Sequence, residues 1–150
     1  MARALEIVGE RWSLLIIRDA LFAHVTRFSD FQRGLGVAPN VLTARLDAFV
    51  AAGLMERRRY CEQPEQFEYV LTAKGRDLAP AIIALTRWGD RWAASAEPPI
   101  LYTHSECGRT IEPQTVCARC GAVDHTQVHA APGPGMPAGY VENRRRRRSG

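Results

Sequence analysis

Two short segments of this 150-residue chain share a pattern of metal-binding side chains. Each segment contains a ligand residue, two intervening residues, a cysteine and a glycine, over residues 104–108 and 117–121. Two intervening residues allow both ligands to face one ion, and the glycine allows the backbone to turn beneath them. Four protein ligands fill a tetrahedral site, so a zinc ion held here would be structural and not catalytic. The expected zinc ligands are His104, Cys107, Cys117 and Cys120.

Other interpretations of this cluster remain open. His125 or His129 could supply the fourth ligand. Cys117 and Cys120 could act as a redox pair, or the clustered cysteines could be reduced and without a ligand. Zinc is favoured because this part of the chain has few apolar residues and could hardly fold without a metal. The fourth cysteine, Cys61, is interpreted as an incidental thiol in preference to a redox-active one.

A second set of residues could read DNA from the exposed face of a helix expected over residues 40–52. Near the start of such a helix, Asn40 can pair with adenine and Arg45 with guanine, through two hydrogen bonds each. Thr43 can contact a thymine methyl group or a phosphate. The alternative is a solvated helix face without a partner. The expected DNA-reading residues are Pro39, Asn40, Thr43, Ala44 and Arg45.

Basic residues outside this helix are expected to contact phosphates. Arg57, Arg58 and Arg59 lie in one predicted strand, where alternation places Arg58 on the opposite face from the other two. A charged edge strand that prevents aggregation is the alternative interpretation. Arg27 and Gln66 complete the expected DNA-binding set.

Apolar periodicity predicts the elements that would position these side chains. Two helices are expected over residues 3–9 and 11–23, and a third follows them. The third helix is expected to be capped at its start by Thr26 or Ser29. Gly34 and Gly36 are expected to end it.

The helix over residues 40–52 would begin with Pro39 in its first turn and stop at Gly53. Its expected buried stripe consists of Leu42, Leu46, Phe49 and Val50. Two short helices joined by a tight, glycine-containing turn have the layout of a helix-turn-helix. Two strands over residues 54–60 and 67–71, separated by a loop, would then form a hairpin wing.

A last helix is expected from residues 72–75 to about Ser95. Its apolar residues are three or four positions apart, which places them on one face. Because this stripe is longer than one small domain needs, we expect it to be an interface between two copies of the chain. A ligand cage formed by the three tryptophans is the less favoured interpretation. The expected interface residues are Leu78, Ile82, Leu85, Trp88 and Trp92.

Composition divides the chain into three parts. They are a DNA-binding and dimerisation domain over residues 1–96, a zinc-ribbon-like extension over 97–129, and a disordered basic tail over 130–150. The net charge is +4, and without the five arginines at 144–148 it would be −1. Total charge is therefore weak evidence for nucleic-acid binding, which must be argued from the local pattern.

No apolar run approaches the ~18–20 residues that a membrane span needs. Charged residues at positions 6, 10 and 11 argue against a signal peptide, so we expect a cytoplasmic protein without membrane contact. The expected fold class is α+β and mainly helical. It is a winged helix-turn-helix with a long C-terminal dimerisation helix and a small zinc-ribbon-like extension.

Six separated motifs together resemble the HxlR family of winged helix-turn-helix regulators. They lie at residues 9–12, 28–31, 42–46, 53–54, 69–75 and 88–92. The resemblance implies a homodimer that binds a pseudo-palindromic operator and regulates responses to aldehydes, redox stress or small molecules. Two departures from the family pattern stand out. The chain begins with Met1 to Arg3 about where relatives carry Cys-Pro, so either the start is truncated or this member lacks that sensor cysteine. The expected wing tip carries Glu65 where relatives are often basic.

The predicted function is a sequence-specific transcription regulator that acts as a homodimer on double-stranded DNA, with a small-molecule inducer as a further partner of unknown identity. A general transcription adaptor that contacts polymerase is the alternative, since winged helix plus zinc ribbon is also the layout of basal initiation factors. A stable homodimer favours the regulator, and a monomer favours the adaptor. The sequence shows no glycine-rich phosphate loop and no supported catalytic set, so an enzyme is not expected.

Overall fold

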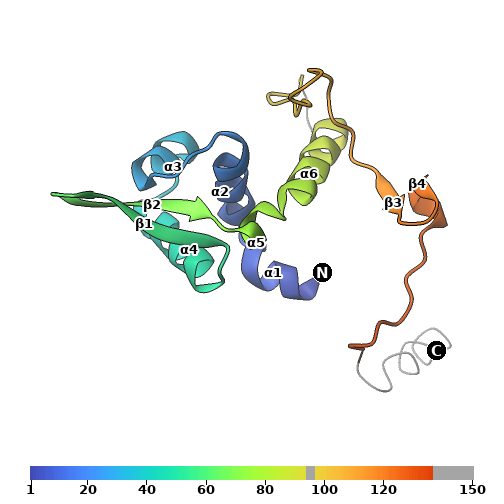
Figure 1. The fold of residues 1–150 in the computed structure, drawn as a ribbon, viewed down its shortest axis with the longest axis horizontal. Coiled ribbons are helices and arrows are strands. Elements are labelled where there is room, and N and C mark those ends of the chain that lie inside the picture. The colour runs from blue at the N-terminus through green and yellow to red at the C-terminus, as the bar shows by residue number, and fades with distance from the viewer. Residues whose placement is uncertain (94–96, 137–150) are drawn as a thin grey trace. The chain divides into compact units, whose positions relative to one another are not determined.

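The computed structural model describes residues 1–93 and 97–136 (Figure 1). The chain forms two compact units, Met1–Pro113 and Gln114–Gly150. The sequence placed a boundary at residues 96 and 97, whereas the structure joins the segment 97–113 to the first unit. The five arginines at 144–148 lie outside the described residues. In the described ranges, no helix is both long enough and apolar enough to cross a bilayer.

The first unit begins with four helices, close to their expected positions. They are α1 (Ala2–Val8), α2 (Arg11–Phe22), α3 (Phe28–Leu35) and α4 (Pro39–Ala51). The expected cap of α3 was wrong, because the N-cap is Arg27 and no side chain among the described residues caps that end. Gly36 ends α3 with a left-handed φ of 63°, while Gly34 lies inside the helix.

Helix α4 has the predicted start and stop signals. Pro39 occupies its first turn, where a missing backbone N–H removes no helical hydrogen bond. Leu42, Leu46 and Phe49 are fully buried, but Val50 is 36% exposed, which corrects its expected place in the buried stripe. The rotation of about 100° per residue after Phe49 turns Val50 to the edge of the buried face.

The wing is longer than predicted. Strands β1 (Met55–Glu62) and β2 (Glu65–Leu71) pair antiparallel, so only Gln63 and Pro64 remain of the expected loop. Polar residues such as Cys61 and Gln66 continue the ladder, because backbone pairing at a solvated hairpin end needs no apolar side chains. The base of the wing is tied to the helices where the Tyr69 amide donates to the Thr26 carbonyl at 2.7 Å.

The expected single C-terminal helix is two helices, α5 (Ala73–Arg76) and α6 (Ala79–Trp92). Pro80 explains the break, because it lacks the N–H that would continue a helix from Arg76 and its ring disfavours that path. Thr72 caps α5 by accepting a hydrogen bond from the Gly75 amide at 3.2 Å. The described part of α6 ends at Trp92, and Ser95 lies outside the described residues.

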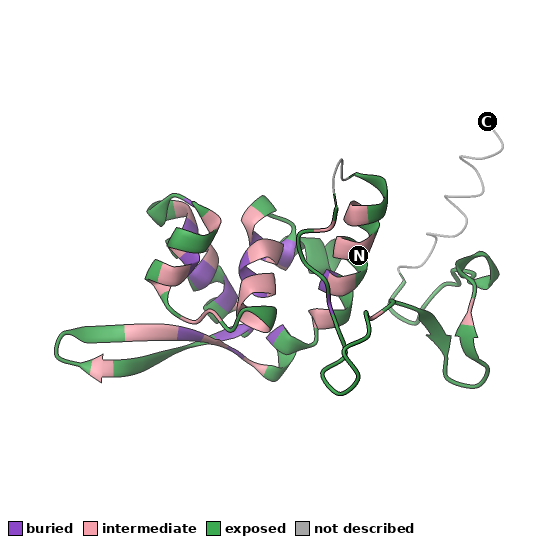
Figure 2. Ribbon diagram, turned by 90° about the horizontal axis from the view of Figure 1, so that it is seen from above, coloured by how far each residue is buried: buried purple, intermediate pink, exposed green. Residues whose placement is uncertain are grey.

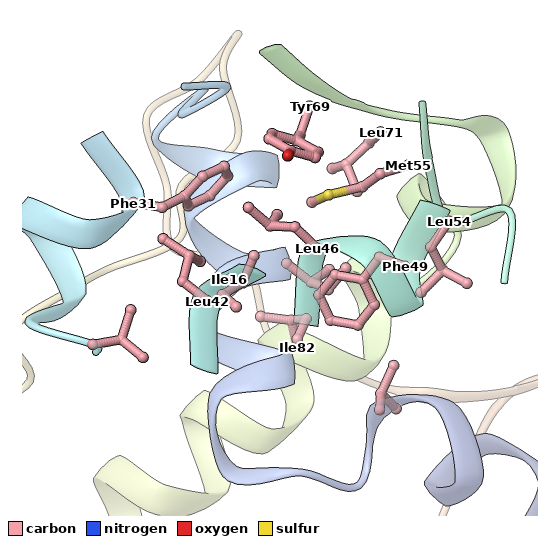
Figure 3. Packing of buried hydrophobic residues seen from close by; sticks show 13 residues of the cluster. Ile16, Phe31, Leu42, Leu46, Phe49, Leu54, Met55, Tyr69, Leu71 and Ile82 are labelled. Atoms are coloured by element: carbon pink, nitrogen blue, oxygen red, sulfur yellow. The ribbon is translucent and has the colours of Figure 1, made fainter. Parts of the chain in front are cut away.

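The core of the first unit lies where α2, α3 and α4 meet the base of the wing and the start of α6 (Figure 3). Figure 2 shows buried positions concentrated in these helices and at one end of the hairpin. Ile82 is 3% exposed and Leu78 packs against this cluster, so both contribute to the core of their own chain. The largest fully buried side chains are Phe31, Phe49, Ile16, Ile17, Leu42, Leu46 and Met55.

The segment after α6 is held to the helices by Tyr102. This residue is 5% exposed, and its ring centroid lies 4.5 Å from that of Phe22. Its hydroxyl lies 3.4 Å from the Thr86 hydroxyl, and Arg87 forms an ion pair with Glu112. These contacts explain why the prolines after α6 do not begin a separate unit.

The second unit has little regular structure. It contains the two-stranded sheet of β3 (Thr115–Cys117) and β4 (Gly121–Val123), followed by a 3₁₀ turn, η1 (His125–Gln127). Over the described residues 114–136, no side chain is buried and only Val123 is partly covered. Hydrophobic burial within this unit therefore contributes little to its folding.

Candidate nucleic-acid interface

Helix α4 presents an exposed face next to the tight turn that follows α3. Pro39, Asn40, Thr43 and Ala44 are exposed, and Arg45 is half-buried. Within the described part of the chain, the side chains of Asn40, Thr43 and Arg45 have no hydrogen-bond or ion-pair partner. Their donors and acceptors are therefore free to meet base edges or phosphates. The structure brings together the predicted DNA-reading residues of this helix on one surface.

The three consecutive arginines of β1 all have partners within the wing. Arg58 forms an ion pair with Glu68 at 2.8 Å, and this hydrogen-bonded partner holds the pKa of Glu68 below its ordinary value. Arg59 lies 3.5 Å from Glu65 and 3.7 Å from Glu62. These exposed pairs are weak and break readily, so they reduce the charge offered to DNA without removing it.

The third arginine of the run, Arg57, stacks on an aromatic ring. Its guanidinium carbon lies 3.7 Å from the centroid of Phe67. The predicted alternation holds through Arg59, after which a bulge shifts the register. The two wing strands together carry three arginines and four glutamates, so the wing has a net charge of −1. A net negative wing is a poor general phosphate binder.

Tyr60 is a wing residue that the sequence-based prediction missed. Its hydroxyl hydrogen-bonds to Gln66, and its ring lies 4.6 Å from the guanidinium carbon of Arg27. Arg27 and Gln66 are thus connected to one side chain of the wing. No signal in the sequence shows this connection, because it depends on the backbone bridge between Arg27 and Glu68.

Helix α6 carries an exposed apolar face beyond the core residue Ile82. Leu85 is 53% exposed, Trp88 62% and Trp92 67%. These residues are three and four positions apart and therefore share one side of the helix. Trp12 packs against the core instead, and among the described residues the three tryptophans form no stacked aromatic pair.

Two local turns contain the predicted zinc ligands. In the first unit, the Cys107 sulfur lies 3.4 Å from Nδ1 of His104, and the Gly108 amide donates to the His104 carbonyl at 2.8 Å. In the second unit, backbone amides of Arg119 and Cys120 donate to the Cys117 sulfur and hold the pKa of its thiol below the usual value. Both turns end at a glycine with positive φ, 70° at position 108 and 80° at position 121.

The described residues include no assembled group of three or more histidine, cysteine or acidic side chains. Each predicted pair of zinc ligands therefore lies within its own turn, without a third metal-binding side chain beside it among the described residues. The competing histidine at position 125 lies 3.6 Å from Asp124 and is exposed. All four cysteines are free thiols, and Cys61 donates to the Gln63 carbonyl at 3.7 Å.

Two helices joined by a tight turn, followed by a two-stranded wing, define a winged helix-turn-helix DNA-binding protein. The model of the HxlR-like helix-turn-helix family matches residues 7–97 of the chain. The protein belongs to this family, and it is a DNA-binding transcription regulator and not an enzyme.

Similarity to some relatives extends beyond the winged helix. An uncharacterized HTH-type transcriptional regulator of Mycobacterium tuberculosis is 44% identical over 140 residues, covering 92% of this chain and 88% of the relative. The solved transcription-factor structure PA1374 of Pseudomonas aeruginosa is 38% identical, covers 95% of this chain and 97% of its own, and has a TM-score of 0.68. These matches must include most of the residues after α6.

Other relatives share the winged helix alone. The redox regulator HypR in its reduced form is 27% identical, with a TM-score of 0.55. Its match covers 60% of this chain and 89% of HypR. Only about a tenth of HypR lies outside the match, so HypR is too short to contain a counterpart of most of the segment that follows α6 in this chain. The extension distinguishes one set of relatives from another.

Proposed function

We propose that the protein is a homodimer whose two α4 helices bind the half-sites of a pseudo-palindromic operator. The observation that carries this proposal is the exposed apolar face of α6, formed by Leu85, Trp88 and Trp92. Apolar surface left in water costs about 25 cal/mol per Å², so a helix face of this kind favours a partner. A second copy of the chain supplies an identical face and closes the interface by two-fold symmetry.

Dimerisation fits the way in which a single α4 reads DNA. One recognition helix contacts few base pairs, whereas two helices related by two-fold symmetry read an inverted repeat. Asn40, Thr43 and Arg45 would make the base contacts, with Pro39 and Ala44 allowing a close approach to the groove. The free N–H groups at the start of α4 would bind a phosphate.

The wing would serve as a secondary contact in this arrangement. Its net charge of −1 opposes the phosphate backbone, while Arg57, Arg58 and Arg59 can each leave an internal partner for a phosphate. Affinity would then depend on the helix-turn-helix and on Arg27 more than on the wing.

The oligomeric state tests this proposal directly. Sedimentation of the full chain at micromolar concentration should give about twice the chain mass of 16.7 kDa. Trp88→Glu should give a monomer, because it places a charge in the apolar interface. Val128→Glu is the matched control, since Val128 is 54% exposed in the second unit. A monomeric native chain would contradict the proposal and favour the transcription-adaptor alternative.

A further inference from the structure

We propose that Tyr60 is a positioning residue for DNA binding, which holds the guanidinium of Arg27 where it can contact a phosphate of the DNA backbone. The wing would then act on DNA through a residue of another element, in addition to any contact made by its own arginines. The proposal rests on the DNA binding of the family and does not require the proposed homodimer.

The backbone of Arg27 is fixed to the wing. Arg27 is the N-cap residue of α3, and it forms an isolated antiparallel bridge with Glu68 of β2. Next to this bridge, the Tyr69 amide donates to the Thr26 carbonyl at 2.7 Å. The start of α3 and the second wing strand are therefore joined through their backbones, and Arg27 itself is exposed to solvent.

Tyr60 meets Arg27 at a bulge in β1. Its two neighbours, Arg59 and Cys61, pair with consecutive residues of β2, so Tyr60 is the extra residue without a partner in the ladder. A bulge of this kind bends its strand and changes the direction of a side chain. The guanidinium carbon of Arg27 lies over the Tyr60 ring, 4.6 Å from its centroid.

This contact leaves the hydrogen-bond donors of Arg27 unused. A cation over an aromatic face is held by the charge distribution of the ring, without an N–H group being consumed in a hydrogen bond. Among the described residues, the Arg27 side chain forms no hydrogen bond or ion pair. Arg58 and Arg59 differ, because their N–H groups meet wing glutamates. Arg27 is thus restrained and still able to offer its donors to a phosphate.

Gln66 holds the ring in turn. The Tyr60 hydroxyl donates to Oε1 of Gln66 across the hairpin. Gln66 would therefore support Tyr60, in place of the direct DNA contact expected from the sequence. Glu68 faces Arg27 across the backbone bridge, but its carboxylate is paired with Arg58 at 2.8 Å. That pairing offsets the negative charge beside Arg27 and leaves the guanidinium available for a phosphate.

Binding to a duplex of random sequence tests the proposal, because a phosphate contact does not depend on sequence. Arg27→Ala should weaken this binding about tenfold, which is the effect of losing one hydrogen bond to a charged group. The slope of affinity against salt should fall by about one unit. Arg11→Ala is the matched control and should keep the slope, since Arg11 also lies over a ring, 5.1 Å from the Trp12 centroid, but belongs to α2.

Substitutions of Tyr60 separate the effect of its ring from that of its hydroxyl. Tyr60→Leu removes the aromatic face and should weaken binding ~2–5-fold, as expected for an exposed cation–π contact. Tyr60→Phe keeps the face and should lose less affinity than Tyr60→Leu. Gln66→Ala should match Tyr60→Phe, because both variants remove the same hydrogen bond. Denaturant midpoints should stay close to the native value, since Tyr60 is 40% exposed.

A double-mutant cycle distinguishes positioning from direct contact. In the Arg27→Ala background, Tyr60→Leu should cost no further affinity, because Tyr60 acts only through Arg27. An equal loss in both backgrounds would overturn the proposal, since Tyr60 would then contact DNA itself or support the wing. Native affinity and salt slope in Arg27→Ala would also overturn it, as would a Tyr60→Phe variant as weak as Tyr60→Leu. These comparisons hold for a monomer or a dimer, so failure of the homodimer proposal would be recognised separately by sedimentation.

Discussion

At the scale of single residues, the arginines of the predicted DNA-binding surface differ in their side-chain partners, which the sequence alone does not show. Arg58 and Arg59 lie in ion pairs with wing glutamates, and Arg57 stacks on Phe67. Arg45, by contrast, has no side-chain partner within the described residues and lies on the helix that follows the turn. Of these four arginines, Arg45 alone has a side chain without an internal partner among the described residues, so it is the one we expect to read a base.

Arg45→Ala should lower operator affinity by ~1–3 kcal/mol with little change on random DNA, because a lost base contact costs about that much. Arg58→Ala is the comparison. Because Arg58 is expected to contact a phosphate, its loss should weaken binding to operator and to random DNA alike and should lower the salt dependence of the affinity. Binding isotherms on both DNAs at several salt concentrations measure this. Equal losses on the two DNAs for Arg45→Ala would instead make Arg45 a phosphate contact.

Glu68→Gln should strengthen binding to random DNA and steepen its salt dependence by about one unit of slope. The reason is that Glu68 pairs with Arg58 at 2.8 Å, and its loss releases that charge for a phosphate. Glu56→Gln removes the same charge from β1 and is the matched control. A similar gain from both variants would show that only the net charge of the wing matters.

At the scale of elements, the predictions succeeded where local chemistry decides and failed where it does not. The bounds of α4 follow from Pro39 and Gly53, which act on their own backbone. The wing strands are longer than predicted because the backbone of polar residues can form ladder hydrogen bonds as well as that of apolar residues. The predicted final helix ran through residues 77–78, where the structure has a break before α6. Pro80 was the available signal for that break.

Gly75→Ala should destabilise the fold by roughly 1–3 kcal/mol, as overpacking a closed site does. A Cβ at this position would lie 2.3 Å from the Leu54 carbonyl oxygen, and the backbone there cannot yield without disturbing the wing base. Gly34→Ala in α3 is the matched control, because its Cβ would meet nothing within 4 Å and a helical alanine is favoured. Denaturant unfolding compares them, and equal midpoints would contradict the packing at Gly75.

At the scale of the whole molecule, the sequence indicated the family, and the family model ends at residue 97, next to the expected boundary, while the first compact unit of the structure continues to Pro113. Composition changes at Pro98 and Pro99, yet the first unit continues to Pro113 because Tyr102 packs on Phe22. Such a contact joins residues eighty positions apart and leaves no local pattern. The two turns that end at Gly108 and Gly121 were predictable for the opposite reason, since each is formed within five residues.

The central claim is that two copies of α4 read one inverted repeat. Selection of genomic fragments by the purified full chain, followed by sequencing, tests it most directly. We predict enrichment of a pseudo-palindrome whose half-site centres are one helical turn apart, about 10–10.5 base pairs, or a multiple of that distance. Trp88→Glu should lose this enrichment while the Val128→Glu control keeps it. Enrichment of a single unrepeated half-site, or of no sequence at all, would contradict the claim.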